Sequence, residues 1–403
     1  MVNLKVNFCG VESPNPFWLA SSPVSNSAEM VSRAFDAGWG GAIWKTLGLD
    51  GPEGPIVNVT PRLAGLDFEE KKLLGLENIE LITDRPLKEN LKEISEIKKK
   101  YPKNPVFVSI MAGPVREDWQ KLTRIVEEAG ADGIELNFSC PHGMPEKGMG
   151  MAIGQIPDVC QTITTWVKEV AKTPVMAKMT PNITDILVPA RASKKGGADG
   201  ISAINTIQSF LGVNLDTLEP LPTVDGKSMF GGYSGPAVKP IALRFVAQLS
   251  SDKGLALPIS GIGGIATWKD AAEFILAGAT TIQVCTAIMR NGYRIVEDMS
   301  DGLSNFMEEK GFASVSEMVG KILPKLGTHE SLNKKKRMVC SINRDICVKD
   351  DLCYIACQDG GHQAIKLDDK RLPAVDEEKC AGCGLCVLVC PVYDCVTMKE
   401  KTK

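Results

Sequence analysis

Residues 257–287, LPISGIGGIATWKDAAEFILAGATTIQVCTA, contain the pattern that decides the fold. Two short apolar runs, 257–264 and 281–287, flank a stretch in which apolar residues recur every three or four positions. That stretch ends in Ala-Gly, which is a helix stop signal. Continuously apolar strands are typical of a parallel sheet that is buried on both faces. The segment therefore predicts a strand–helix–strand unit of an α/β protein.

The same unit recurs along the first part of the chain. The other apolar runs are PFWLASSP (16–23), GAIWKT (41–46), PVFVSIM (105–111), GIELNFS (133–139), PVMAKMT (174–180) and GISAINT (200–206). Amphipathic helical stretches separate most of these runs. Eight such units predict a closed (β/α)₈ TIM barrel in residues 1–310, and a doubly wound open sheet is the alternative.

Composition and charge exclude several classes of protein. The chain has 403 residues, of which 44% are hydrophobic and 24% charged, as in ordinary soluble globular proteins. Its net charge of −3 provides no global basic field, so we expect no nucleic acid partner. No run of apolar residues is long enough to span a membrane, and the first twenty residues show no secretory signal. We therefore expect a cytoplasmic protein.

The cysteines are crowded at the C-terminal end of the chain. Nine of the 13 fall within residues 340–395. In a chain without a secretory signal, this crowding favours metal or cluster ligation over disulfides. We therefore predict a second, cysteine-rich domain in residues 341–403. A helical linker, residues 311–340, would join it to the barrel.

One cysteine motif in the tail has a specific spacing. Cys380, Cys383, Cys386 and Cys390 are followed by Pro391, which is the bacterial ferredoxin motif for a 4Fe–4S cluster. In two-cluster ferredoxins the fourth cysteine of such a motif ligates the other cluster. Zinc is a weaker alternative, because zinc ligands usually fall into two separated pairs.

The upstream half of the tail is irregular. Cys347, Cys353 and Cys357 match the same template, but Asp350 occupies the second ligand position. Three explanations remain open. Asp350 ligates iron through its carboxylate, or the site holds a 3Fe–4S cluster. In the third explanation, Cys340 or Cys395 ligates the iron, and both of these cysteines lie outside the spacing of the ferredoxin motif.

Polar residues follow nearly every predicted barrel strand. In a parallel barrel the carboxyl ends of the strands converge on one face, where active sites form. The residues at these ends are Ser21, Lys45, Thr46, Asn137, Ser139, Lys178, Thr180, Asn205, Thr206, Gly263, Gly264 and Thr286. The glycine turn after the seventh strand and Thr286 after the eighth predict a phosphate-binding site.

Lysines and asparagines at these ends indicate the kind of ligand. Lys45 and Lys178 end apolar strands, where each is either paired with a structural carboxylate or placed beside an anionic cofactor. Asn78, Asn137 and Asn205 offer donors and acceptors side by side, which suits a flat polar ring.

A cysteine directly follows the fourth strand. Cys140 precedes a glycine- and methionine-rich stretch, residues 141–155, which predicts a mobile lid. At this hinge Cys140 is a candidate nucleophile or proton donor. His142 either tunes this thiol or faces solvent.

These motifs together resemble a known family. The chain resembles the catalytic subunit of the bacterial NAD-dependent dihydropyrimidine dehydrogenases and, more distantly, the dihydroorotate dehydrogenases. The likeness runs through NPFWLASSP (15–23), AGWGGAIWKT (37–46), NIELI (78–82), ELNFSCPHGM (135–144), AKMTPNITD (177–185), GGYSGPAVKPIALRF (231–245), ISGIGGI (259–265), QVCTAIM (283–289) and the ferredoxin-like tail.

The resemblance implies cofactors and residue roles. It implies FMN in the barrel and two iron–sulfur clusters in the tail. FMN would contact Ser21, Lys45, Thr46, Lys178, Gly235, Gly263, Gly264, Cys285 and Thr286. A pyrimidine would contact Asn78, Asn137, Phe138, Ser139, Asn205 and Thr206, with Glu80 beside it. Cys140 would be the catalytic acid, and Lys178 would stabilise negative charge on the reduced flavin.

The resemblance also implies an activity and partners. The enzyme would reduce the 5,6 double bond of uracil or thymine, with Cys140 protonating C5. Because the chain shows no Gly-x-Gly-x-x-Gly strand–helix unit, NADH would bind to a partner subunit with FAD and iron–sulfur clusters. A homodimer within a heterotetramer is implied as well.

Two other functions remain possible from the sequence. The first is the oxidation or reduction of dihydroorotate or another cyclic amide or enone. Orotate carries a carboxylate, and the sequence shows no obvious cation for it beyond Lys45 and Lys178. The second is a non-catalytic electron-transfer subunit, against which the intact Cys140 and asparagines argue.

Overall fold

The computed structural model describes residues 2–68, 72–140 and 150–401. The chain divides into two compact units, Met1–Lys325 and Leu326–Lys403. The predicted linker, residues 311–340, is thus split between them. Each unit is described by itself below.

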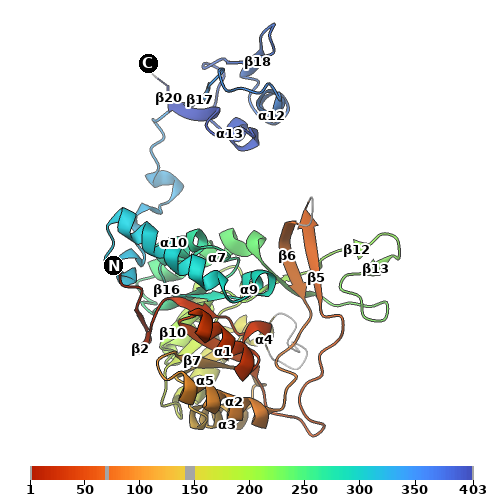
Figure 1. Ribbon diagram of the computed structural model, residues 1–403, viewed down its shortest axis with the longest axis vertical. Coiled ribbons are helices and arrows are strands. Elements are labelled where there is room, and N and C mark those ends of the chain that lie inside the picture. The colour runs from red at the N-terminus through yellow and green to blue at the C-terminus, as the bar shows by residue number, and fades with distance from the viewer. Residues whose placement is uncertain (1, 69–71, 141–149, 402–403) are drawn as a thin grey trace. The chain divides into compact units, whose positions relative to one another are not determined.

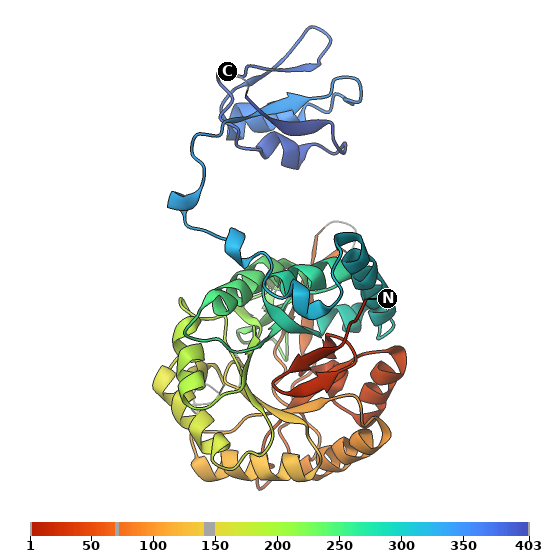
Figure 2. The ribbon, with the colours of Figure 1, turned by 90° about the vertical axis from the view of Figure 1, so that its left-hand side faces the viewer.

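The first unit is a closed barrel of eight parallel strands, which confirms the predicted fold class (Figure 2). Each of the eight predicted apolar runs supplies one strand. The strands, in chain order, are β3 (Phe17–Leu19), β4 (Gly41–Leu47), β7 (Val106–Ile110), β8 (Gly133–Asn137), β9 (Val175–Lys178), β10 (Gly200–Ala203), β15 (Ile259–Ile262) and β16 (Ala279–Val284). Pairing of β16 with β3 closes the ring, so the open-sheet alternative is wrong.

Helices surround the barrel on its outer side (Figure 2). They are η1 (Pro23–Ser25), α1 (Ala28–Ala37), α2 (Leu87–Lys100), α3 (Arg116–Glu128), α4 (Met151–Gly154), α5 (Pro157–Lys168), α6 (Leu187–Lys195), η3 (Pro236–Val238), α7 (Lys239–Ser251), α8 (Trp268–Leu276), α9 (Thr286–Asn291) and α10 (Ile295–Lys310). Their apolar faces are buried; α3, for example, buries Trp119, Leu122 and Val126. The helix predicted in 268–279 begins at a capping box formed by Thr267 and Asp270.

A small hairpin contributes to the core at the amino ends of the strands. Strands β1 (Val6–Phe8) and β2 (Val11–Ser13) pair antiparallel, and Phe8 is fully buried against Trp18 and Phe107. These rings, with Ile43 and Met176, form a separate apolar cluster. The interior of the barrel is therefore closed by aromatic packing at that end. The sequence analysis did not predict this hairpin, because its strands have only three residues each.

A second sheet was also not predicted. Strands β11 (Ile207–Ser209), β14 (Gly231–Ser234), β6 (Lys72–Asn78) and β5 (Leu63–Phe68) form an antiparallel sheet in that order. A two-stranded ribbon, β12 (Val213–Asn214) and β13 (Glu219–Pro220), lies between β11 and β14 in the chain (Figure 1). The second sheet matters for function because Asn78 ends β6 and Glu80 follows it closely.

Two local predictions differ from the structure. The linker 311–340 is predicted to be helical, but α11 covers only Val315–Met318 and a 3₁₀ turn, η4, covers Leu323–Lys325. Another 3₁₀ turn, η5, covers His329–Ser331. The stretch 141–155 is predicted to be a mobile lid, but Met151–Gly154 within it forms the helix α4. Residues 141–149, and with them His142, lie outside the described residues.

The second unit is small and built on paired strands. Strand β17 (Met338–Ile342) pairs with β20 (Val396–Glu400), and β18 (Ile365–Leu367) pairs with β19 (Pro373–Val375). Two short helices, α12 (Leu352–Gly360) and α13 (Leu385–Val389), complete it. Its buried core consists largely of cysteines. In neither unit is there a described helix that is long and apolar enough to cross a membrane.

Candidate active site

A cavity opens at the carboxyl ends of the barrel strands, where the sequence places the candidate residues. It is lined by the candidates Ser21, Lys45, Thr46, Asn78, Asn137, Cys140, Lys178, Asn205, Thr206, Gly235, Gly263, Gly264, Cys285 and Thr286. These residues come from the barrel strands and from the second sheet. The structure thus brings most of the predicted residues together in one place.

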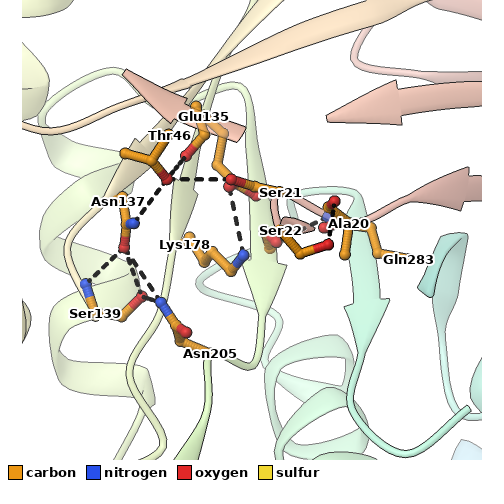
Figure 3. A network of polar contacts seen from close by, with 12 residues as sticks. Ala20, Ser21, Ser22, Thr46, Glu135, Asn137, Ser139, Lys178, Asn205 and Gln283 are labelled. Atoms are coloured by element: carbon orange, nitrogen blue, oxygen red, sulfur yellow. Dashed lines mark hydrogen bonds and ion pairs between the residues drawn. The ribbon is translucent and has the colours of Figure 1, made fainter. Parts of the chain in front are cut away.

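Thr46 is the centre of a hydrogen-bond network under this cavity (Figure 3). Its hydroxyl oxygen lies 3.1 Å from Ser21 Oγ and 2.9 Å from Ser109 Oγ. Asn137 Nδ2 donates to the same oxygen at 3.0 Å. One hydroxyl therefore links the ends of β3, β4, β7 and β8. Such a network holds its side chains in fixed orientations.

The asparagines are oriented by further bonds. Asn205 Nδ2 donates to Asn137 Oδ1 at 3.2 Å and to Ser139 Oγ at 2.8 Å. On the second sheet, Asn78 Nδ2 donates to the carbonyl of Gly232 at 3.0 Å. These amides approach the cavity from two directions, one from the barrel and one from the sheet. Their positions suit a ligand with polar groups on more than one edge.

Two predicted contact residues do not line the cavity. Phe138 is fully buried and packs edge-on against Trp119, with ring centroids 5.9 Å apart. Its side chain faces the helix layer because it alternates with Asn137, which faces inward. Ser139 is also fully buried, but its hydroxyl accepts the bond from Asn205. Ser139 therefore positions another residue instead of lining the cavity.

Both candidate lysines are paired with carboxylates, as the structural alternative predicts, and both line the cavity. Lys45 Nζ lies 2.5 Å from Glu80 Oε1, and both side chains are nearly buried, at 5% and 8% exposure. Arg62 Nη1 also contacts Glu80 Oε1, at 2.8 Å, and Asp84 Oδ2 at 3.3 Å. Glu80 lines the cavity. The result is a network of two cations and two anions at one side of the site.

Lys178 belongs to a second charged pair, deeper in the barrel. Its Nζ lies 3.5 Å from Glu135 Oε1, and the side chains are 5% and 0% exposed. On nearby strands, Gln283 Nε2 donates to Ser202 Oγ and to Ser260 Oγ, at 2.9 Å each. The interior below the cavity is therefore polar, in contrast to the aromatic cluster at the other end of the barrel.

The loops after β15 and β16 contain the predicted glycine turn and Thr286. With Gly235, the residues Gly263, Gly264, Cys285 and Thr286 are called the glycine cradle. Gly264 has φ +76°, and a Cβ there would lie 2.6 Å from Lys239 N and 2.9 Å from Gly235 O. Helix α9 begins at Thr286, whose hydroxyl lies 3.0 Å from Ser234 Oγ. A side chain at position 264 would collide with the backbone atoms of Lys239 and Gly235, so glycine lets the loop after β15 pack against the start of α7. Burial raises the pKa of the neighbouring Cys285 thiol, although a bond with Ser22 opposes the rise.

Cys140 follows β8, which lies across the ring of barrel strands from β15 and β16. It is 8% exposed and packs with Ile82 and Met111. Met151 N donates to the Cys140 carbonyl at 2.9 Å, which brings α4 back to the end of β8. The thiol is thus held by apolar neighbours while it still lines the cavity.

Several lining residues were not proposed from the sequence. Ser234, Gln283 and Arg290 are examples, and Arg290 is a cation beyond the two lysines. Ser234 belongs to the second sheet, so no barrel-strand pattern could have found it. Gln283 could have been found, since it alternates inward on the apolar run 281–287.

In the second unit, cysteines far apart in sequence line one small cavity. Cys357, Cys380, Cys383 and Cys386 surround it, together with Cys340. The N–H of Ala364 donates to Cys357 Sγ at 3.3 Å, and that of Cys340 donates to Cys380 Sγ at 3.4 Å. Backbone donors aimed at cysteine sulfurs are typical of iron–sulfur sites. Here Cys357 of the upstream half joins three cysteines of the downstream motif, as expected when the two halves of a two-cluster ferredoxin exchange their fourth cysteines.

The remaining tail cysteines form the second group. Cys347, Cys390 and Cys395 are neighbours, and Cys353 is near Asp350 and Cys347. Burial raises the pKa of the Cys353 thiol to about 11, and the nearby Asp350 and Cys347 add to this rise. Asp350 Oδ1 accepts a bond from Leu352 N at 2.9 Å, at the start of α12. The residue at the irregular ligand position therefore stands beside the predicted cysteines.

Comparison with known proteins places these sites in a family context. Residues 3–307 match the dihydroorotate dehydrogenase family, and residues 340–398 match the 4Fe-4S dicluster domain. The chain is 48% identical over 401 residues to the NAD-dependent dihydropyrimidine dehydrogenase subunit PreA of Escherichia coli (strain K12), covering 99% of this chain and 96% of that one. It is 44% identical to the chloroplastic dihydropyrimidine dehydrogenase (NADP(+)) of Arabidopsis thaliana, over 83% of this chain and 80% of that one. It is 40% identical to the catalytic subunit of dihydroorotate dehydrogenase B (NAD(+)) of Pyrococcus abyssi, over 79% of this chain and 98% of that one.

The cradle makes a prediction about stability. Gly264→Ala would place a Cβ within 3 Å of the backbone, at a positive φ. Gly311→Ala is a matched control, because Gly311 is left-handed with φ +75° and nothing lies within 4 Å of a Cβ there. Both variants should lose about 1–2 kcal/mol through left-handed strain. Gly264→Ala should lose more, as measured by denaturant unfolding. Equal losses would mean that the close contact at Gly264 does not matter.

Proposed function

The chain belongs to the dihydroorotate dehydrogenase family and ends in a 4Fe-4S dicluster domain, and on this premise we propose that it reduces the 5,6 double bond of uracil or thymine. It is an oxidoreductase of the dihydropyrimidine dehydrogenase type, since its likeness to the PreA subunit extends over 99% of the chain. The observation that carries the proposal is the cavity in which Cys140, the asparagines and Lys178 meet.

The residues present fit FMN. Gly263, Gly264 and Thr286 line the cavity together, and glycine backbone beside a hydroxyl suits a phosphate group. Buried polar atoms deeper in the barrel, such as Gln283 Oε1, have no hydrogen-bond partner in the described part of the chain and face the same interior. We propose that the cradle residues Gly235, Gly263, Gly264, Cys285 and Thr286 hold the phosphate end. Ser21, Lys45, Thr46 and Lys178 would contact the rest of the cofactor.

Each protein group then has a role in the reaction. Bound FMN would supply hydride transfer, which no protein side chain provides. Cys140 would hold a proton on its thiol and donate it to C5 of the pyrimidine, because an ordinary thiol is protonated at neutral pH. Lys178 would place a positive charge where negative charge develops, in a site from which water is largely excluded.

The substrate would be oriented by the amides. Asn78, Asn137 and Asn205, with Thr206, present donors and acceptors that match the carbonyl and N–H groups of a pyrimidine ring. The bond between Asn205 and Asn137 and the bond from Asn78 to the Gly232 carbonyl fix these amides in advance, which lowers the entropic cost of binding. Glu80 adds a carboxylate at the same cavity.

The tail would deliver electrons. The match to the dicluster domain supports two iron–sulfur clusters. We propose that one is held by Cys357, Cys380, Cys383 and Cys386, which line one cavity, and the other by Cys347, Asp350, Cys353 and Cys390. We propose that a partner subunit with FAD and iron–sulfur clusters takes electrons from NADH and passes them to this tail. The name of the PreA relative, which calls it a subunit, supports such a partner.

The function can be tested with the purified chain. Loaded with FMN and iron–sulfur clusters and given an artificial electron donor, it should convert uracil and thymine to their dihydro forms. The assay is run in parallel with orotate. Turnover of orotate alone would overturn the proposed substrate, and loss of both activities in a fully loaded protein would favour an electron-transfer subunit.

Cys140→Ser should keep FMN bound but slow turnover. A serine hydroxyl is a far weaker acid than a thiol, and general acid catalysis is typically worth about 10²–10⁴-fold. Steady-state uracil reduction measures the change. Cys160→Ser is the control, because Cys160 is fully buried in α5 and does not line the cavity. Wild-type turnover in Cys140→Ser would remove this residue from the mechanism.

The cluster that contains Asp350 should be the labile one. A carboxylate is a harder and more easily displaced ligand for iron than a thiolate. On mild oxidation the wild-type chain should give a 3Fe–4S signal in electron paramagnetic resonance, and Asp350→Cys should abolish it. Asp369→Cys, at an exposed turn, serves as the control and should retain the signal. An oxidation-resistant pair of clusters in the wild type would argue against ligation by Asp350.

A further inference from the structure

We propose that Glu135 is a positioning residue that sets the redox behaviour of the flavin by acting on Lys178. The inference rests on the proposed function, because it takes FMN as the group above Lys178. Neither the sequence pattern nor the resemblance assigned a role to Glu135. It lies inside the barrel, one layer below the residues that line the cavity.

The strand register places the two residues together. On the paired strands β8 and β9, Asn137 is the register partner of Lys178, and Glu135 is the partner of Met176. Side chains alternate along a strand, so Glu135 points into the barrel like Asn137 but one step deeper. Glu135 Oε1 lies 3.5 Å from Lys178 Nζ. The lysine is thus between the carboxylate and the cavity.

The Glu135 carboxylate is incompletely satisfied. It is fully buried, and its Oε2 has no hydrogen-bond partner within the described residues. Burying a carboxylate in this state is unfavourable unless a nearby charge compensates for it. The described charge that does so is Lys178, and the contact is longer than a usual charge-assisted bond of about 2.7–2.9 Å. The pair is therefore loose enough for Lys178 to respond to charge on its other side.

This geometry has a consequence for the flavin. Glu135 draws the ammonium group down and offsets its charge, so the field of Lys178 at the cavity is weaker than that of an isolated lysine. Removal of the negative charge should leave the lysine field unopposed. A reduced, negatively charged flavin would then be stabilised more than the oxidised form. Glu135 would therefore hold the flavin at a lower potential than Lys178 alone would set.

The test is the midpoint potential of bound FMN in the full-length protein. Glu135→Gln keeps the shape and removes the charge, and its potential should shift to more positive values. Glu77→Gln is a matched control. Glu77 is also fully buried with one carboxylate oxygen that lacks a partner in the described chain, but it lies on β6 and does not line the cavity. Its potential should equal that of the wild type. An unchanged potential in Glu135→Gln would overturn the inference.

Two further variants show whether Glu135 acts through Lys178. In a Lys178→Met background, Glu135→Gln should shift the potential little, and a full shift there would overturn the positioning role. Glu135→Asp keeps the charge but withdraws it by one methylene group, so its shift should be smaller and of the same sign. If Glu135→Gln does not fold, a wild-type potential in Glu135→Asp overturns the inference. Wild-type protein that binds no FMN would instead overturn the proposed function, and this inference with it.

Discussion

Closure of the barrel is the constraint on which the rest of the structure depends. The first and last strands pair, with Trp18 opposite Gln283, and Ala20 N donates to the Val284 carbonyl at 3.0 Å. This pairing carries the end of β3, with Ser21, to the end of β16. Because all eight strands are parallel, their carboxyl ends meet in one ring. The cavity lies at this ring of strand ends, and residues from several strands line it.

Charge balance shapes the interior of that ring. Lys45 faces Glu80, and Lys178 faces Glu135, so each buried cation has a carboxylate near it. Isolated charges would be costly to bury, but paired ones can stay ionised in a low-dielectric site. The site therefore keeps strong local fields without a large net charge. That property suits a reaction in which a cofactor gains charge and loses it again.

The core of the second unit differs in kind from that of the barrel. The unit has little apolar surface to bury, and its core is made largely of cysteines. Cysteines from α12 and from the 380–390 motif have to meet for that core to form. Backbone donors such as Ala364 N already point at the sulfurs. Folding of this unit and cluster binding are thus expected to depend on each other, as in other small metal-containing domains.

The sequence by itself determined the barrel, the order of its strands and the cysteine motif, because these are periodic or locally spaced patterns. It also located the strand ends, and with them Lys178, Asn137 and the glycine cradle. The tertiary structure alone decided that Lys45 meets Glu80 and Arg62, that Phe138 faces the core, and that Asn78 reaches the cavity from a second sheet. The bond from Asn78 to Gly232 joins residues 154 positions apart. Such contacts depend on how short strands with a weak hydrophobic pattern pair with distant parts of the chain. Local periodicity in the sequence does not predict this pairing.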